Sequence, residues 1–218
     1  MKKVIGVFDS GVGGLSVANA IQKAFPDYTI EYREDTKNVP YGTKTPEQLH
    51  ALVLPILQEL AGMCDVIVIA CNTITTTLID ELRTELPIPL VGIEPMIKPA
   101  AQLTNSKVIT VCATPTTLGS KRYAQLKEQF GKNVTIVEPD CSDWAELIEQ
   151  NAINEEKLRQ DIEPSLQKGS DVIVLACTHY HWIESEITKL VGNSVTVLQP
   201  EDAIMTRLKV VLEQKIDK

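Results

Sequence analysis

Two cysteines, Cys71 and Cys177, end closely similar stretches that lie far apart in the chain. The first stretch, residues 65–73, reads DVIVIACNT, and the second, residues 171–179, reads DVIVLACTH. Each cysteine follows an apolar run and precedes small polar residues. A single cysteine in such a place is usually a small apolar residue of the core. A single cysteine of this kind needs no special explanation, but its repetition in two similar stretches does.

Two thiols on opposite faces of one carbon suit the inversion of a stereocentre by proton transfer. A base must remove the proton from one face, and an acid must supply a proton to the other. A pair made of one thiolate and one thiol serves both directions. A free thiol has a pKa of about 8.5, so a neighbouring group must activate it. The alternative is a structural duplication whose cysteines have no chemical role.

Three residues are candidate activators of these thiols. Asp9 follows the first apolar run, His179 comes shortly after Cys177, and Glu149 ends an amphipathic stretch. Titratable groups with shifted pKa values often gather at functional sites. Each also has a structural alternative: Asp9 as a helix cap, His179 as an ordinary loop histidine, and Glu149 as a solvated acid. The DSGVGG segment that begins at Asp9 suits either an anion-binding turn or a tight strand–helix turn.

Short apolar runs alternate with amphipathic stretches along the whole chain, which indicates the α/β class. The runs VIVIA and VIVLA are apolar throughout, as expected for strands of a parallel sheet that helices cover on both faces. We predict strands at Lys3–Phe8, Thr29–Glu34, Val66–Cys71, Leu90–Ile93, Lys107–Cys112, Val134–Val137, Val172–Cys177 and Val195–Leu198. We predict helices at Leu15–Phe25, Pro46–Ala61, Thr75–Glu85, Pro95–Leu103, Thr116–Phe130, Trp144–Gln150, Glu155–Gln167, Trp182–Leu190 and Asp202–Lys215.

One strand–helix series runs to about Pro95, and a second begins at about Lys107. We therefore expect two similar domains with mostly parallel sheets flanked by helices. The first would comprise residues 1–95 and 196–218, and the second residues 96–195. Ligands of such sheets bind outside the carboxyl ends of the strands. Both cysteines lie at such ends, so we expect the active site in the cleft between the domains.

Two further loops at predicted strand ends carry groups that suit a ligand. Tyr41, in the VPYG loop, is either a hydrogen-bond donor to a ligand or an aromatic lid on a rigid turn. Thr114 and Thr117 begin a predicted helix, where hydroxyl groups suit carboxylate binding or plain capping.

The composition narrows the function and the compartment. The chain has 218 residues with 21 basic and 29 acidic side chains, and its net charge of -8 disfavours a general nucleic-acid binder. We see no signal peptide and no apolar stretch long enough for a membrane span. The five cysteines include no Cys-x-x-Cys pair, so neither a zinc cluster nor a disulfide framework is indicated. We expect a cytoplasmic protein with reduced thiols.

Several motifs, in a fixed order along nearly the whole chain, resemble one family. They are GVFDSGVGGLSV, VPYG, ACNT, GIEP, ATPTT and ACTHY. Together they resemble the glutamate racemases, cofactor-independent members of the aspartate/glutamate racemase superfamily. The resemblance implies two α/β domains with the site between them. It also implies interconversion of L- and D-glutamate, which supplies D-glutamate for bacterial peptidoglycan.

The resemblance also assigns roles to residues of this chain. It implies that Cys71 and Cys177 are the acid/base pair, that Asp9 assists Cys71, and that His179 and Glu149 assist Cys177. The residues implied in substrate binding are Ser10, Pro40, Tyr41, Gly42, Asn72, Thr73, Thr114, Thr117 and Thr178.

The expected partner is the small molecule glutamate, without nucleic acid or membrane, and a homodimer is a candidate assembly. No pyridoxal-phosphate motif is apparent, and two thiols need no such electron sink. We therefore expect no cofactor and no metal.

Three segments depart from the family pattern. His181 replaces the usual proline after ACTHY, Ile74-Thr75 replaces Ala-Ser after ACNT, and residues 199–202 replace an Asp-Ser-Gly or Asp-Ser-Ala segment. These departures leave two alternatives: a racemase for another acidic amino acid such as aspartate, and a relative that binds an amino acid without turnover. A decarboxylase or isomerase with one thiol is a third. The retained cysteine pair argues against the last two.

Overall fold

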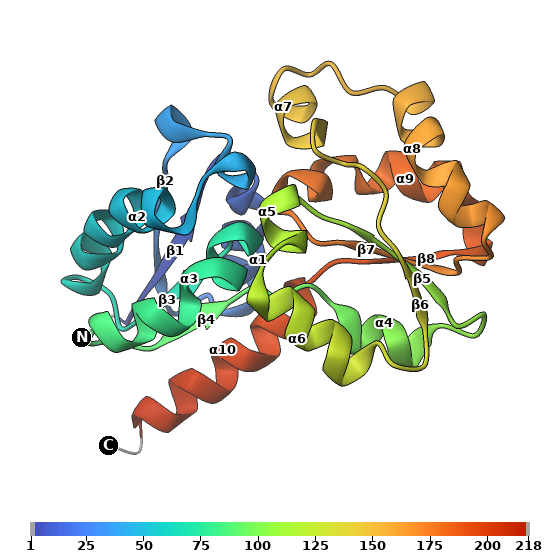
Figure 1. Ribbon diagram of the computed structural model, residues 1–218. Coiled ribbons are helices and arrows are strands. Elements are labelled where there is room, and N and C mark those ends of the chain that lie inside the picture. The colour runs from blue at the N-terminus through green and yellow to red at the C-terminus, as the bar shows by residue number, and fades with distance from the viewer. Residues whose placement is uncertain (1–2, 217–218) are drawn as a thin grey trace. The chain divides into compact units, whose positions relative to one another are not determined.

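The computed structural model describes residues 3–216 and contains two compact units. The first unit is formed by residues 1–94 and 200–218, and the second by residues 95–199. Each unit contains one four-stranded parallel sheet with helices on both faces (Figure 1). The predicted α/β class with two similar domains is confirmed. No helix within residues 3–216 has both the length and the apolar character that crossing a membrane demands.

The two sheets have the same strand order. In the first, the order is β2–β1–β3–β4, with bounds Val4–Asp9 (β1), Thr29–Glu34 (β2), Val66–Ile69 (β3) and Leu90–Gly92 (β4). In the second, the order is β6–β5–β7–β8, with bounds Val108–Cys112 (β5), Thr135–Val137 (β6), Val172–Leu175 (β7) and Thr196–Leu198 (β8). Strands β3 and β7 are therefore equivalent, and each is followed by one of the two repeated cysteines.

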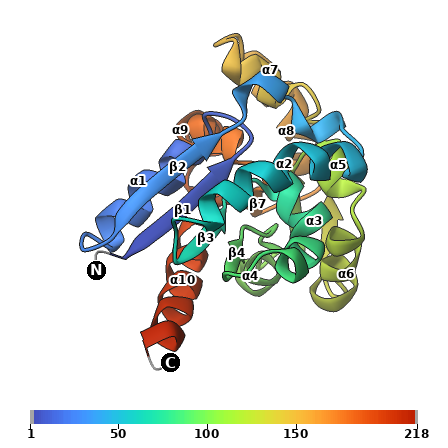
Figure 2. The same ribbon diagram turned by 90° about the vertical axis from the view of Figure 1, so that its left-hand side faces the viewer.

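Helices cover both faces of the first sheet because alternate side chains of each strand point to opposite faces. Ile67 and Ile69 of β3 pack with α2 (Pro46–Ala61) and α3 (Asn72–Glu85). Val66 and Val68 pack on the other face with α1 (Gly14–Ala24) and α10 (Glu201–Ile216). All four helices can be followed in Figure 2. Burial on both faces is why β3 is apolar at every position.

The second sheet is covered in the same way. One face packs against α4 (Ile97–Leu103) and α6 (Lys121–Phe130). The other packs against α7 (Trp144–Glu149), α8 (Glu155–Gln167) and α9 (Glu184–Val191). The short helix α5 (Pro115–Leu118) precedes α6, where one continuous helix over residues 116–130 was predicted. The break occurs because the Ser120 hydroxyl accepts a hydrogen bond from the Tyr123 backbone N–H and starts a new helix.

The last strand lies in the second unit, so our assignment of residues 196–199 to the first domain is wrong. Strand β8 pairs in parallel with β7, with Val197 opposite Ile173. Strand β7 pairs with β5 along one edge, and β8 pairs with its other edge as the last strand of that sheet. The chain returns to the first unit only with α10, which follows Pro200.

Candidate functional site

Cys71 lies at the N-terminus of a helix in the first unit. We predicted that its strand would run to Cys71 and its helix would begin at Thr75. Instead β3 ends at Ile69 and the 14-residue helix α3 begins at Asn72, which makes Cys71 its N-cap residue. The first backbone N–H groups of a helix have no partner within it. These groups therefore face the Cys71 side chain.

Opposing effects set the pKa of the Cys71 thiol. Burial and the negative charge of Asp9 raise this pKa. Hydrogen bonds from the N–H groups of Ile74 and Thr73 and the contact with the Ser10 hydroxyl lower it, and the net pKa is about 11. The sulfur lies 3.5 Å from the Ser10 hydroxyl oxygen, and Cys71 is 4% exposed. Cys71 is thus a neutral thiol at pH 7, with helix N–H groups placed to stabilise its thiolate.

Asp9 ends β1 and is fully buried. Its carboxylate accepts a hydrogen bond of 2.7 Å from the backbone N–H of Gly14, the first residue of α1. A side chain at Gly14 would collide with Asp9, since its Cβ would lie 2.4 Å from the Asp9 Cβ. Asp9 thus accepts a hydrogen bond from the first N–H of α1, although the N-cap residue is Gly13, and the charge of Asp9 also acts on the Cys71 thiol.

Tyr41 is buried, and its hydroxyl donates a 2.6 Å hydrogen bond to the carboxylate of Asp35. Desolvation, this bond and the charges of Asp35, Cys71 and Asp9 all raise the Tyr41 pKa well above its usual value. The proton we expected Tyr41 to offer a ligand is therefore given to Asp35. Of its neighbours in the loop, Gly42 is buried and Pro40 is exposed.

The side-chain amide of Asn72 is an unusual feature of the first unit. Asn72 is 2% exposed, and neither its oxygen nor its nitrogen has a hydrogen-bond partner among the described residues. A buried polar group without a partner costs about 1–3 kcal/mol. An amide directly after Cys71 with free donor and acceptor atoms suits an amino-acid ligand, which carries both carboxylates and an amine. Thr73, the next residue, is also buried.

Cys177 occupies the equivalent position in the second unit. It follows β7 by two residues and is the N-cap of a 3-10 helix over Thr178–Ile183. Its sulfur lies 3.8 Å from Nδ1 of His179, whose Nε2 lies 2.8 Å from a carboxylate oxygen of Glu149. The sequence expectation that His179 and Glu149 accompany Cys177 thus corresponds to a continuous chain of contacts.

This chain of contacts constrains which nitrogen of His179 carries the hydrogen. When Nε2 donates its hydrogen to the Glu149 carboxylate, Nδ1 is the acceptor nitrogen that faces the sulfur. His179 is 4% exposed, so water does not compete for this nitrogen. In this tautomer, Nδ1 of His179 is placed to accept a hydrogen from the Cys177 thiol.

Aromatic packing holds Glu149 in place. Trp144, at the start of α7, packs edge-on against Tyr180 with ring centroids 5.1 Å apart. The Tyr180 hydroxyl donates to the backbone carbonyl of Cys141 at 2.8 Å, and the indole N–H of Trp144 donates to Asp161 at 2.7 Å. These contacts tie α7 to the 3-10 helix that carries His179.

The remaining predicted binding residues of the second unit are buried hydroxyl groups. The Thr114 hydroxyl caps α5, because it accepts from the Thr117 backbone N–H at 3.3 Å and donates to the Thr117 hydroxyl at 3.1 Å. The capping alternative therefore holds for this pair. Thr178 is buried directly after Cys177.

The departures from the family pattern lie in different surroundings. Ile74 packs in the core between the sheet and α2, and Thr75 is also buried. His181 is buried, and among the described residues neither ring nitrogen has a hydrogen bond of good geometry, although the Leu175 carbonyl is nearby; Trp182 beside it is 53% exposed. Burial lowers the pKa of His181 to about 4; the Leu175 carbonyl opposes this effect and His179 adds to it. Residues 199–200 join β8 to α10 and residues 201–202 begin that helix, and the Asp202 side chain lies outside the described residues.

Sequence reasoning missed Asp35, which orients Tyr41. Asp35 directly follows β2, so the rule that selected Asp9 at the end of β1 would have selected it too. The N–H groups of Thr73 and Ile74 were also missed, because the helix was expected to start later.

The family model described as Asp/Glu/Hydantoin racemase matches residues 9–208. A protein of Ectopseudomonas mendocina (strain ymp) named glutamate racemase is 38% identical, with 96% of this chain and 82% of that protein covered. Among solved structures, Escherichia coli glutamate racemase in complex with L-glutamate and the activator UDP-MurNAc-ala superposes with a TM-score of 0.90 at 29% identity, over 98% of this chain and 83% of that one. Glutamate racemase isoform RacE1 from Bacillus anthracis superposes with a TM-score of 0.85 at 30% identity. The match covers 99% of this chain and 84% of that one.

Proposed function

The chain belongs to the Asp/Glu/hydantoin racemase family, and we propose that it interconverts L- and D-glutamate by transferring protons at the α-carbon. The observation that carries this function is the matched pair of buried cysteines. Cys71 and Cys177 each follow the third strand of a sheet with the same strand order. A protein that only binds an amino acid needs neither thiol.

The reaction proceeds in two proton transfers. A thiolate takes the α-proton, so that the Cα–H bond breaks, an S–H bond forms and the electron pair stays on the substrate as a carbanion. The thiol on the other face gives its proton to that carbanion and becomes a thiolate. The product is the opposite enantiomer, and the protonation states of the two thiols are exchanged. One turnover in the reverse direction restores them.

The two thiols are activated differently. The Cys71 thiolate is stabilised by the N-terminus of α3 and the Ser10 hydroxyl, while Asp9 opposes ionisation and favours proton return. The Cys177 proton passes to Nδ1 of His179, which Glu149 orients. Asp9, His179 and Glu149 thus act through the sulfurs and are positioning or proton-relay groups.

The substrate's polar groups are held by side chains next to the two cysteines. The Asn72 amide, with its unpaired oxygen and nitrogen, supports a contact with the substrate amine and a carboxylate. Ser10, Thr73 and Thr178 are buried small polar groups in the same loops. Pro40, Tyr41, Gly42, Thr114 and Thr117 complete the set by shaping the loops at the strand ends.

Glutamate is favoured over aspartate as the substrate. The curated relatives that match over most of the chain are named glutamate racemases. The substituted residues Ile74 and Thr75 are core residues, so they leave the polar set unchanged.

We further propose that the protein acts in the cytoplasm, supplies D-glutamate for peptidoglycan and forms a homodimer. All five cysteines are free and buried, which fits a reducing compartment. Sedimentation velocity over a range of protein concentrations measures the assembly, and a single monomeric species throughout contradicts the dimer.

The first experiment is to incubate the purified protein with L-glutamate in D₂O without added cofactor. Circular dichroism follows the loss of optical activity, and proton NMR follows the loss of the α-proton signal. A racemase that works by proton transfer incorporates deuterium from solvent as it inverts the carbon. We expect the optical signal to decay to zero with deuterium in the product.

A parallel incubation with L-aspartate identifies the alternative substrate. Turnover of aspartate in preference to glutamate moves the assignment to another acidic amino acid. Binding of glutamate without any exchange indicates the non-catalytic relative.

A further inference from the structure

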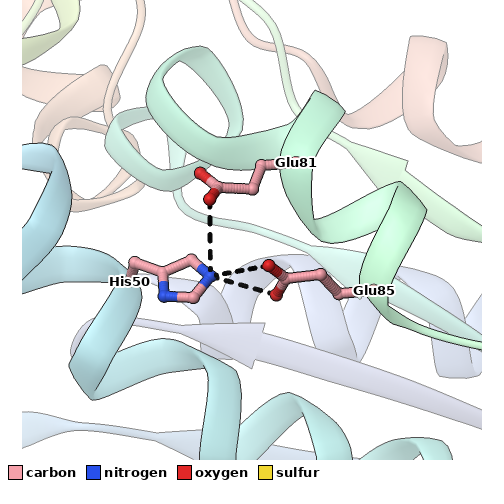
Figure 3. Close-up of side chains that lie close together, drawn as sticks. All are labelled: His50, Glu81 and Glu85. Carbon is pink, nitrogen blue, oxygen red and sulfur yellow. Dashed lines mark hydrogen bonds and ion pairs between the residues drawn. The ribbon is translucent and has the colours of Figure 1, made fainter.

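Outside the cysteine sites, three side chains with metal-binding atoms converge on the surface of the first unit. His50 projects from α2, and Glu81 and Glu85 project from α3. Residues four apart in a helix share one face, so both carboxylates point the same way. Figure 3 shows both carboxylates directed at the same ring nitrogen of His50, with Glu81 above it and Glu85 beside it.

The distances are those of hydrogen bonds and ion pairs, and they hold the donor atoms close enough to share one small transition-metal ion. Nε2 of His50 lies 3.0 and 3.2 Å from the two oxygens of Glu85, and 3.8 Å from an oxygen of Glu81. Zinc binds imidazole nitrogen and carboxylate oxygen at about 2.0–2.2 Å, so two ligand atoms of a tetrahedral site stand about 3.4 Å apart. The measured separations lie on both sides of that value. All ligand atoms lie within 4.8 Å of one another.

Hydrogen bonding accounts for only part of this arrangement. One ring nitrogen carries at most one hydrogen, yet two carboxylates approach the same Nε2 of His50. The two carboxylates also repel each other, because like charges at this helical spacing are unfavourable. A divalent cation between the three groups removes both conflicts.

The donor set selects the class of cation. One imidazole with two carboxylates suits zinc and the neighbouring divalent transition metals, whereas calcium and magnesium prefer all-oxygen sites. The side chains of His50, Glu85 and Glu81 are 26%, 33% and 56% exposed, which leaves open positions for water ligands.

We propose that His50, Glu81 and Glu85 bind one divalent transition-metal ion of the zinc class, which links α2 to the C-terminal part of α3. The opposite end of α3 carries Cys71 and the N–H groups that face its sulfur. The ion therefore braces the helix that begins after Cys71, at the end away from that thiol. This inference does not depend on the proposed function.

The test uses the untagged full chain, stripped with a chelator and dialysed into metal-free buffer. Isothermal titration with zinc chloride measures stoichiometry and affinity. We expect one ion per chain at this site, with His50→Ala and Glu85→Gln each weakening its binding at least tenfold. The matched control is Asp80→Asn, the exposed acid next to Glu81 outside the cluster, which leaves the affinity unchanged.

Cobalt(II) distinguishes this site from the cysteines, because thiolate ligands produce a strong charge-transfer absorption that nitrogen and oxygen ligands do not. We expect weak visible bands that disappear in His50→Ala and persist in Cys71→Ser and Cys177→Ser. The proposal is overturned if His50→Ala binds zinc as tightly as the parent chain, if cobalt shows only thiolate absorption, or if no ion binds below millimolar concentration. These readouts are independent of racemase turnover.

Discussion

At the scale of single residues, the two thiols that we propose as the acid/base pair have different surroundings. Cys71 faces helix N–H groups and the charge of Asp9, whereas Cys177 contacts a histidine that a glutamate orients. Two similar stretches of sequence therefore lead to two different surroundings. The difference arises because Cys71 begins an α-helix in the first unit, whereas Cys177 begins a 3-10 helix that carries His179 in the second.

We predict that Cys71→Ser and Cys177→Ser each lower the racemisation rate by at least a thousandfold, because a serine hydroxyl is a far weaker acid than a thiol. The two enantiomers are equally stable in water, so kcat/KM must fall by the same factor in both directions. Each variant keeps one thiol, which can still exchange the α-proton on one face without inversion. We expect the two variants to exchange opposite enantiomers, measured by proton NMR in D₂O.

Cys64→Ser is the matched control, since Cys64 is a buried cysteine of the first unit that precedes β3 rather than following it. It should retain racemisation in any population that folds. Full turnover by either Cys71→Ser or Cys177→Ser, or exchange of the same enantiomer by both, would show that the two-base assignment is wrong.

At the scale of elements, each sheet has an aspartate at the amino end of its third strand. Asp65, before β3, accepts from the backbone N–H of Val4 at 2.9 Å. Asp171, before β7, accepts from the Thr104 hydroxyl and from the N–H groups of Asn105 and Ser106. Both carboxylates lie at the end of the strand away from the cysteines, so we assign them a role in stability.

We predict that Asp171→Asn destabilises the second unit by about 1 kcal/mol at pH 7, a value kept low because the carboxylate is partly exposed to solvent. Desolvation opposes the shift, but hydrogen bonds from Thr104, Ser106 and Asn105 lower the pKa of Asp171 to about 2. The ionised form therefore stabilises the fold above pH 4, and this contribution is lost as the pH falls from about 4 to about 2.

Urea unfolding followed by tryptophan fluorescence measures this effect, since Trp144 and Trp182 both lie in the second unit. The difference between the parent chain and Asp171→Asn should shrink between pH 7 and pH 3, with racemisation at pH 7 unchanged. A difference as large at pH 3 as at pH 7, or a loss of activity without a loss of stability, contradicts the assignment.

At the scale of the whole molecule, the proposed substrate should stabilise the folded protein. A ligand present at a hundred times its Kd adds about 2.7 kcal/mol to the free energy of unfolding. For a chain of this size, 1 kcal/mol raises Tm by about 2–4 °C. We predict that L- and D-glutamate each raise Tm by about 5–11 °C, measured by differential scanning calorimetry.

L-aspartate and sodium chloride at the same concentration are the controls for this experiment. Each should raise Tm by less than half as much as glutamate. An equal or larger shift with aspartate would favour the alternative substrate, and no shift with any amino acid would remove the support for a binding site in the resting protein.

Local patterns in the sequence were sufficient to predict the class and most helix and strand positions, and they placed Cys71 and Cys177 within two residues of a strand end. Apolar runs followed by small polar residues place strand ends within two residues, as β3 and β7 do. The helices α2 and α8 begin and end at the predicted residues, since Thr45 and Asn154 cap their first turns. Periodicity and capping act over a few residues and can be read from the chain.

Contacts between distant side chains became known only from the folded structure. Glu149 reaches His179 from α7, and His50 faces Glu85 from the neighbouring helix α2. Strand β8 joined the second sheet, although a strand followed by a helix reads the same for either sheet. These contacts depend on which sheet edge a strand joins and on which helices pack side by side. A local sequence pattern does not contain that information.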